Sequence, residues 1–200
     1  MEIEAKYAVS SADLETLATI RQLGGYTLAP APAPELQENV YYDTADGRLT
    51  AARYGLRVRR TGEHALITLK GPADVGHDGV HRRAEFEFPG ANPDPRTWPD
   101  GVACDLALAL TGGAPLLPRV VIRTERRVLQ ITRDGAPVAE LCLDRGVMQS
   151  GPRERPFTEV EIELREAGTA ADLSALAREL ATLVALTPEP RSKLERALTL

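Results

Sequence analysis

The chain has 200 residues, of which 43% are hydrophobic and 26% charged, a composition typical of one moderate-sized soluble domain. Its 24 basic and 29 acidic residues give a formal net charge of −5, which argues against general binding to nucleic acids or membrane surfaces. The sequence has no apolar run long enough to span a bilayer, and its N-terminus is charged from the second residue, unlike a secretory signal peptide. Two cysteines are too few for a disulfide framework, so we expect buried thiols. Together these features predict a cytoplasmic protein.

Short strands dominate the first half of the chain after one helix. Alternating polar and apolar residues predict a strand over 1–9, and Ser10 or Ser11 can cap a helix that ends at Gly24-Gly25. The alternating alanine and proline residues of 29–34 predict a stiff extended connector. The other elements expected here are strands at 37–43, 56–60, 65–70 and 80–88, with loops at 71–79 and 89–99.

The second half predicts a helix, a long hairpin, a strand and two more helices. The hairpin turns at Asp134-Gly135, which suits a tight turn. The expected ranges are helix 102–110, strands 119–132, 138–148 and 157–164, an amphipathic helix 170–185 and a short helix 191–200. We therefore expect an α+β fold in which eight antiparallel strands close into a β-barrel, or tunnel, with helices flanking it and at the C-terminus, as a single domain over 1–200.

Several of these strands carry their charges on one face. Because successive side chains of a strand point to opposite faces, charges two residues apart share a face. The runs are Glu2, Glu4 and Lys6; Arg57 and Arg59; Arg83, Glu85 and Glu87; and Glu159, Glu161 and Glu163. A solvated sheet face, the alternative, normally mixes signs along each strand. Strands dominated by one sign predict the walls of a cavity for a cation and an anion together, such as a metal ion with polyphosphate.

Nine short motifs follow one another through the chain. They are Glu2-x-Glu4-x-Lys6; Tyr41-Tyr42-Asp43-Thr44; Leu56-Arg57-Val58-Arg59; Thr68-Leu69-Lys70; Gly79-Val80-His81-Arg82-Arg83-Ala84-Glu85; the segment from Arg123 to Arg127; Leu143-Asp144-Arg145-Gly146; Glu159-Val160-Glu161-Ile162-Glu163; and Ser192-Lys193. In this order the chain resembles the CYTH family, the triphosphate tunnel metalloenzymes, over almost its whole length. The resemblance implies a tunnel of eight antiparallel strands with a charged interior.

The resemblance also implies roles for the charged residues. Carboxylates would hold one or two Mg²⁺ or Mn²⁺ ions: Glu2, Glu4, Glu161 and Glu163, with Asp144 and Glu85 completing the acidic side. Basic side chains would bind the triphosphate: Lys6, Arg57, Arg59, Lys70, Arg83, Arg123 and Lys193. The catalytic residues would be Glu4, Lys6 and Glu163, with Glu4 or Glu163 taking the proton of the attacking water, a choice that stays open.

The segment 123–127 matches the family less closely. Arg123 and Arg127 share one face of the expected strand, and Arg126 points the other way unless a bulge intervenes. We expect Arg123 to face the tunnel and keep Arg126 and Arg127 as alternatives.

The resemblance predicts a metal-dependent triphosphatase, with inorganic triphosphate as the expected substrate. A charged tunnel with few aromatic residues offers little stacking surface for an organic group. The enzymatic alternatives are a class IV-type adenylate cyclase and a thiamine triphosphatase, and the non-enzymatic alternative is a polyphosphate- or nucleotide-binding module. We expect a small-molecule partner, no nucleic acid or membrane partner, and a monomer or homodimer.

Overall fold

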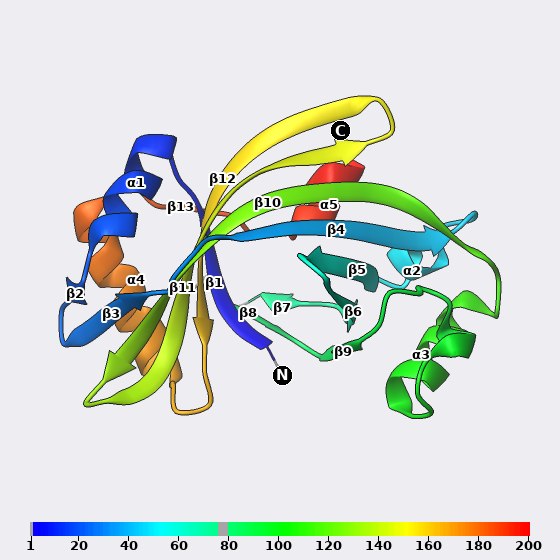
Figure 1. Cartoon of the computed structure of the whole chain (residues 1–200), viewed down its shortest axis with the longest axis horizontal. Coiled ribbons are helices and arrows are strands. Elements are labelled where there is room, and N and C mark those ends of the chain that lie inside the picture. The colour runs from blue at the N-terminus through cyan, green and yellow to red at the C-terminus, as the bar shows by residue number, and fades with distance from the viewer. Residues whose placement is uncertain (1, 76–79) are drawn as a thin grey trace.

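The computed structural model describes residues 2–75 and 80–200, and its strands form an antiparallel, nearly closed barrel (Figure 1). The expected loop at 71–79 lies partly outside the described residues, and its described part includes the short strand β7 (Asp74–Val75). In spatial order the wall of the described barrel consists of β8 (Val80–Arg83), β1 (Glu2–Ala8), β12 (Arg153–Leu164), β11 (Ala136–Ser150), β10 (Leu116–Arg133), β4 (Glu35–Thr44), β5 (Gly55–Thr61), β6 (His64–Lys70) and β9 (Glu85–Pro89).

The barrel closes through a strand that is interrupted at Ala84. β8 pairs with β1, whereas β9, which follows directly in sequence, pairs with β6. Between them the carbonyl oxygen of Ala84 accepts a hydrogen bond from the Gly71 amide at 2.9 Å. The single strand expected at 80–88 is therefore two strands, and the described wall has nine strands where eight were expected. The predicted fold class, an antiparallel barrel with flanking helices, is confirmed.

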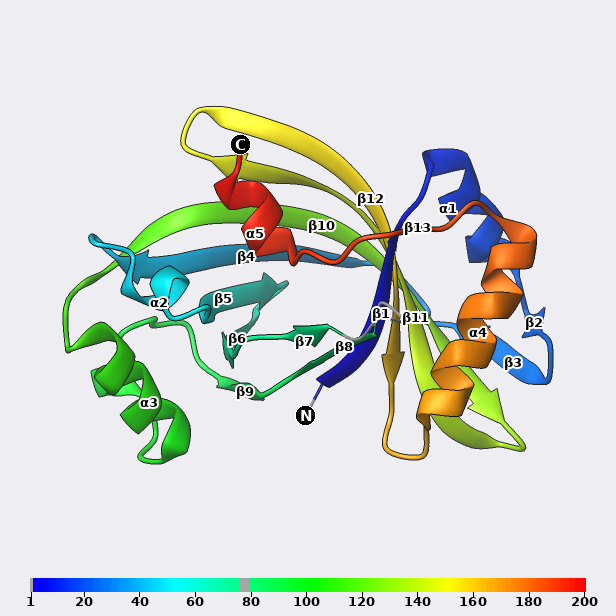
Figure 2. The same ribbon diagram turned by 180° about the vertical axis from the view of Figure 1, so that it is seen from behind.

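Three long strands carry the wall beyond the barrel. β10, β11 and β12 have 18, 15 and 12 residues, more than the alternation alone indicated. Their outer faces support α1 (Ser11–Thr19) and α4 (Ala170–Leu183) at one end of the molecule, while α2 (Arg48–Ala51) and α3 (Val102–Thr111) lie at the other end (Figures 1 and 2). The remaining elements are β2 (Gln22–Leu23), β3 (Tyr26–Pro30), η1 (Pro95–Thr97), β13 (Thr187–Pro188) and α5 (Lys193–Leu198).

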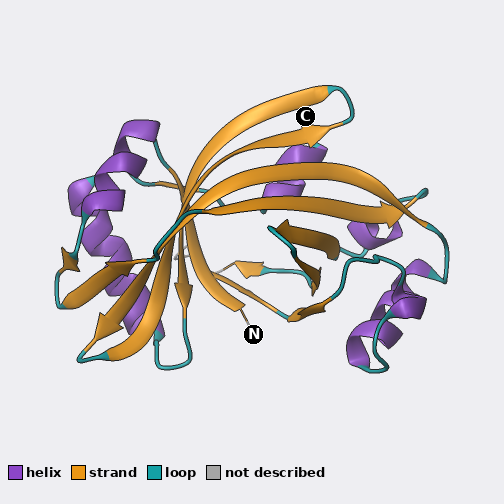
Figure 3. Ribbon diagram, in the orientation of Figure 1, coloured by secondary structure: helices purple, strands orange, loops and turns teal. Residues whose placement is uncertain are grey.

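Caps set the helix ends. Ser10 caps α1 by accepting from the Asp13 amide, and the helix ends at Thr19, earlier than the glycine pair at 24–25 predicted. Thr169 and Asp172 form a capping box at the start of α4, and Ser192 and Glu195 form another at the start of α5. The expected connector at 29–34 begins inside β3, which pairs along β10. Figure 3 shows these helices against the strands of the wall.

Asp43 explains why α2 forms immediately after β4. Its Oδ1 accepts from the Thr44 and Leu49 amides at 2.7 and 2.8 Å, and its Oδ2 accepts from the Thr50 amide at 2.9 Å. These bonds satisfy amides that a helix start leaves without partners. In the Tyr41-Tyr42-Asp43-Thr44 motif, the aspartate therefore has a structural role.

The two larger apolar cores lie outside the tunnel. One joins α1 and α4 to the outer faces of β10, β11 and β12, with Leu17, Leu141 and Leu176 fully buried. The other joins α2 and α3 to the outer faces of β5 and β6 around Leu56 and Leu69. Because the apolar side chains of these strands are used on the outside, the alternate side chains must point into the barrel.

Both cysteines, Cys104 and Cys142, are free and buried, as predicted. Within the two described ranges, no helix has the length and apolar character needed to cross a lipid bilayer.

Candidate active site

A polar cavity of about 590 Å³ runs through the barrel. Its walls are the inward faces of the strands, so charged residues that alternate along the sequence point into the cavity together. The structure brings thirteen of the predicted site residues to this cavity: Glu2, Glu4, Lys6, Arg57, Arg59, Lys70, Arg83, Glu85, Arg126, Asp144, Glu161, Glu163 and Lys193.

Arg123 and Arg127 do not reach the cavity. Arg123 lies on the outer face of β10 with 57% of its side chain exposed, where it forms an ion pair with Glu38. Arg127 pairs with Glu15 on α1. The β10–β11 ladder keeps its register from Val121 to Ile131, so no bulge changes the facing of these residues. The expectation that Arg123 faces the tunnel was therefore wrong, and Arg126, kept as an alternative, is the inward residue.

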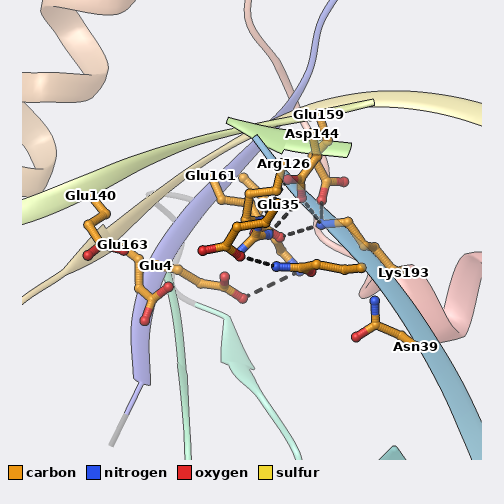
Figure 4. Close-up of polar contacts among 12 residues, drawn as sticks. Glu4, Glu35, Asn39, Arg126, Glu140, Asp144, Glu159, Glu161, Glu163 and Lys193 are labelled. Atoms are coloured by element: carbon orange, nitrogen blue, oxygen red, sulfur yellow. Dashed lines mark hydrogen bonds and ion pairs between the residues drawn. The ribbon is translucent and has the colours of Figure 1, made fainter. Parts of the chain in front are cut away.

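One group of buried charges ties α5 to the wall (Figure 4). We call it the α5 cluster, and it consists of Arg126, Asp144, Glu159, Glu161, Lys193 and Arg196. Lys193 Nζ lies 2.7 Å from Glu161 and 2.9 Å from Asp144, and it also bonds Glu159. Burial raises the pKa of Glu161, but the charges of Lys193 and Arg126 outweigh it and hold that pKa well below its usual range.

A second group of charges surrounds the N-terminal strand. We call it the β1 cluster, and it consists of Glu2, Glu4, Lys70, Arg83 and Glu85. Arg83 bonds Glu2 at 2.5 Å and Glu4 at 3.0 Å, and Lys70 bonds Glu2 at 2.7 Å. Burial raises the pKa of Glu2, but Lys70 and Arg83 bring it down to about 2.

Glu4 and Glu163 are adjacent carboxylates with raised pKa values, even though Glu4 pairs with Arg83 and Lys6. They face each other as direct partners of the β1–β12 ladder. Burial raises the pKa of Glu4, and the nearby carboxylates of Glu161 and Glu2 raise it further. Burial also raises the pKa of Glu163, whose ion pair is with the partly exposed Arg165 at 3.1 Å. Raised pKa values of adjacent carboxylates indicate a place where an added cation would be stabilised.

The opposite wall is short of negative charge. Among the residues that the structure describes, Arg57 lies 4.0 Å from its nearest carboxylate, that of Glu85, and its buried Nε has no hydrogen-bond partner. Arg59 hydrogen-bonds the amide oxygen of Asn39 and, within the described ranges, forms no ion pair with a carboxylate. Burial and the charges of Arg57 and Arg126 lower the pKa of Arg59 to about 10. These guanidinium groups form a place where an anion would be stabilised.

Sequence reasoning missed several residues of the cavity. On β4 and β10 the lining side chains Gln37, Asn39, Tyr41 and Thr124 are uncharged, so the search for charge runs passed over them. Arg196 belongs to the α5 cluster, and Glu140, Arg165 and His81 also line the cavity or pair at its edge. Glu159, also in the α5 cluster, was part of the predicted acidic run but was not among the predicted site residues. The signal for Asn39 and Gln37 was their position two and four residues before Tyr41, on the same face of the strand. The signal for Arg196 was its position one helical turn after Lys193.

Comparisons with known proteins agree with this architecture. The model of the CYTH domain matches residues 1–198. The chain is 28% identical over 142 residues to the inorganic triphosphatase of Haemophilus influenzae, an alignment that covers 68% of this chain and spans 37% of that longer protein.

Solved structures share the fold. A candidate adenylate cyclase from Bacillus halodurans superposes with a TM-score of 0.68 and 22% identity, covering 98% of this chain and 96% of that chain. A candidate adenylyl cyclase from Hippeastrum, with a dominant triphosphatase activity, superposes with a TM-score of 0.67 and 21% identity, covering 100% and 96% of the two chains. With the family model matching nearly every residue of the charged barrel, the chain belongs to the CYTH domain family.

Proposed function

We propose that residues 1–200 act as a single tunnel domain that hydrolyses inorganic triphosphate to diphosphate and phosphate with Mg²⁺ or Mn²⁺. The observation that supports the proposal is the placement of two arginines and two adjacent carboxylates on different walls of one cavity. Among the described residues, Arg57 comes no closer than 4.0 Å to a carboxylate and Arg59 bonds a neutral amide. Glu4 and Glu163 lie side by side with raised pKa values, although each also pairs with an arginine. A ligand that brings a polyanion and a divalent cation together satisfies both walls at once.

The donor set fits a hard metal ion at Glu4 and Glu163. The oxygens of Asp144, Glu159 and Glu161 also lie within 4.8 Å of one another, but Lys193, Arg126 and Arg196 already neutralise them. Glu4 and Glu163 are adjacent carboxylates that fewer cations contact, and Glu2, Glu85, Asp144 and Glu161 complete the acidic surroundings. When bound there, Mg²⁺ or Mn²⁺ would lower the pKa of a water molecule and offset phosphate charge.

The side chains of the cavity would bind and orient the substrate and accept a proton from the attacking water. Lys6, Arg57, Arg59, Lys70, Arg83, Arg126 and Lys193 supply the cations that hold the phosphates. Water attacks the terminal phosphorus in line, the bond to the bridging oxygen breaks, and diphosphate leaves with that electron pair. Glu4 or Glu163 accepts the proton of the water through a carboxylate oxygen that does not bind the metal.

Inorganic triphosphate is favoured over an organic triphosphate by the lining of the cavity. Charged side chains dominate it, and its described tyrosines are Tyr41 and Tyr54. The inorganic triphosphatase of Haemophilus influenzae and the Hippeastrum protein with dominant triphosphatase activity support the same reaction class. The Bacillus halodurans protein makes cyclisation of ATP the second candidate.

The test is a comparison of substrates with one preparation of the protein. Phosphate release is measured from inorganic triphosphate, thiamine triphosphate and ATP with Mg²⁺, with Mn²⁺ and with chelator, and cyclic AMP is assayed from ATP. We expect the highest kcat/KM for inorganic triphosphate and no turnover in chelator. Cyclic AMP as the main product would establish the cyclase instead, and binding without any turnover would leave a polyphosphate-binding module.

A further inference from the structure

Both the oxygen and the nitrogen of the Asn39 side-chain amide make hydrogen bonds. The residue lies in β4 directly opposite Arg59 of β5 and Ile122 of β10. Its Oδ1 accepts a hydrogen bond from Arg59 Nε at 2.9 Å, and its Nδ2 donates to the Ile122 carbonyl oxygen at 3.4 Å. A carbonyl oxygen can only accept, so the Nδ2 atom must face Ile122 and the oxygen must face Arg59. The residue is buried, with 4% of its surface exposed.

Arg59 is held differently from Arg83 and Arg126, two other arginines of the cavity. Arg83 is bonded by Glu2 and Glu4, and Arg126 by Asp144 and Glu161. Arg59 instead meets a neutral amide at its Nε edge. Figure 4 shows Asn39 projecting from β4 at a distance from Glu140 and Glu163, so the amide stands apart from these carboxylates.

This choice of partner has a consequence for anion binding. A carboxylate at the Nε edge would neutralise the guanidinium and compete with phosphate for it. An amide oxygen fixes the plane of the guanidinium through one hydrogen bond but leaves its full charge and its two terminal amino groups for phosphate oxygens. A preoriented arginine also loses less side-chain entropy when the ligand arrives.

We propose that Asn39 is a positioning residue, which acts through Arg59 to hold an unneutralised guanidinium ready for a phosphate group of the substrate. The inference rests on the proposed function, because it assigns Asn39 a part in recognising the triphosphate. Replacing the amide by a carboxylate of the same shape, Asn39→Asp, would convert Arg59 into an ion-paired arginine like Arg83 and Arg126.

A double-mutant cycle tests whether Asn39 acts through Arg59. The Kd of inorganic triphosphate is measured by calorimetry in metal-free buffer, and KM and kcat with Mg²⁺, for wild type, Asn39→Ala, Arg59→Ala and the double variant. We expect Asn39→Ala to weaken triphosphate binding about tenfold, the scale of losing a hydrogen bond to a charged group, and to raise KM more than it lowers kcat. In the Arg59→Ala background the same change should alter Kd less than about twofold.

Gln37→Ala is the matched control. Gln37 is a second buried amide of β4 in the same cavity, but its Nε2 donates to Glu35 and, in the described part of the chain, it forms no hydrogen bond with an arginine. Its effect on Kd should be equal in the wild-type and Arg59→Ala backgrounds. Asn39→Asp should weaken triphosphate binding at least as much as Asn39→Ala and more than Gln37→Glu, which adds the same charge two residues away.

The outcomes separate this inference from the proposed function. A wild-type protein that neither binds nor hydrolyses triphosphate refutes the proposed function and this inference with it. A wild type that binds triphosphate, with an Asn39→Ala effect of equal size in both backgrounds, overturns only the positioning role. Asn39→Ala and Asn39→Asp with lowered melting temperatures and an unchanged Kd would show that Asn39 serves the fold alone.

Discussion

Lys193 on α5 and Glu161 on β12 meet at 2.7 Å inside the barrel, so the last helix of the chain is bound to the acidic wall by a buried ion pair. Glu159 and Asp144 share the same ammonium group. Three carboxylates therefore depend on one lysine, which the Ser-Lys motif had suggested only as a ligand for phosphate. The fold and the proposed substrate site have a residue in common.

The stability of the ligand-free protein should respond in opposite directions at Lys193 and Arg59. Lys193→Met removes the shared partner of buried carboxylates and should lower the free energy of unfolding by about 3–5 kcal/mol. Arg59→Met removes a cation that lies beside Arg57 and Arg126 without a carboxylate partner, and should leave that free energy unchanged or raise it. Urea unfolding measures both, and a loss of equal size at the two positions would contradict the proposed charge distribution.

Inward and outward arginines of one strand should differ in their effect on activity. Arg126→Lys keeps a charge beside Asp144 but loses the planar fork that can bind two oxygens, so kcat/KM for triphosphate should fall about tenfold or more. Arg123→Lys, on the outer face of β10, is the control and should change kcat/KM less than about twofold. If the Arg123 variant proved the more damaging one, Arg123 would have to reach the substrate despite its place outside the barrel.

Removing the charge of Glu163 should reduce turnover by at least about a hundredfold, the scale of losing several kcal/mol of metal-borne charge stabilisation. Glu163→Gln keeps the shape of the side chain while removing an anionic oxygen from the pair formed with Glu4. Glu154→Gln, on the exposed start of the same strand, is the control. Phosphate release is measured across a range of Mg²⁺ concentrations. Full activity of Glu163→Gln at low Mg²⁺ would argue against a metal at this place.

Acid should destabilise the ligand-free protein partly through Glu2. Its pKa of about 2 in the folded protein lies below its usual value of 4.5, so its contribution to stability is complete above pH 4.5 and is lost as the pH falls towards 2. Between those values wild type should lose up to about 3 kcal/mol more unfolding free energy than Glu2→Gln. Unfolding of both proteins is followed from about pH 5 to pH 2. Parallel curves would show that Glu2 is not held charged by Lys70 and Arg83.

Local alternation was enough to predict much of the cavity. Glu2, Glu4 and Lys6 occur in a short strand whose apolar partners leave one choice of face, and the structure places all three in the cavity. The acidic run of β12 follows the same rule. A period of two is a property of the strand itself, so it can be read without knowing which strands become neighbours.

What could not be predicted depends on distant parts of the chain. In β10 basic residues occupy both faces, and the inward one is identified by Asp144 on the neighbouring strand. The division of 80–88 follows from pairing with two strands, β1 and β6, that are far apart in sequence. The role of Asn39 could not be predicted without knowing that β4 lies between β5 and β10, because its amide bonds Arg59 on one strand and Ile122 on the other.

The two large apolar cores on the outside of the barrel leave its interior free to change. Leu141 and Leu143 pack outward beneath α1 and α4, while Glu140 and Asp144 on the same strand line the cavity. Along each wall strand, residues that stabilise the fold by outward packing thus alternate with residues that line the cavity. During evolution, lining residues could be substituted one at a time, changing which phosphorylated compounds bind, while the apolar packing outside the barrel stays the same. Lining residues held in buried ion pairs, such as Lys193 and Glu2, are exceptions, since a change there alters both stability and the cavity.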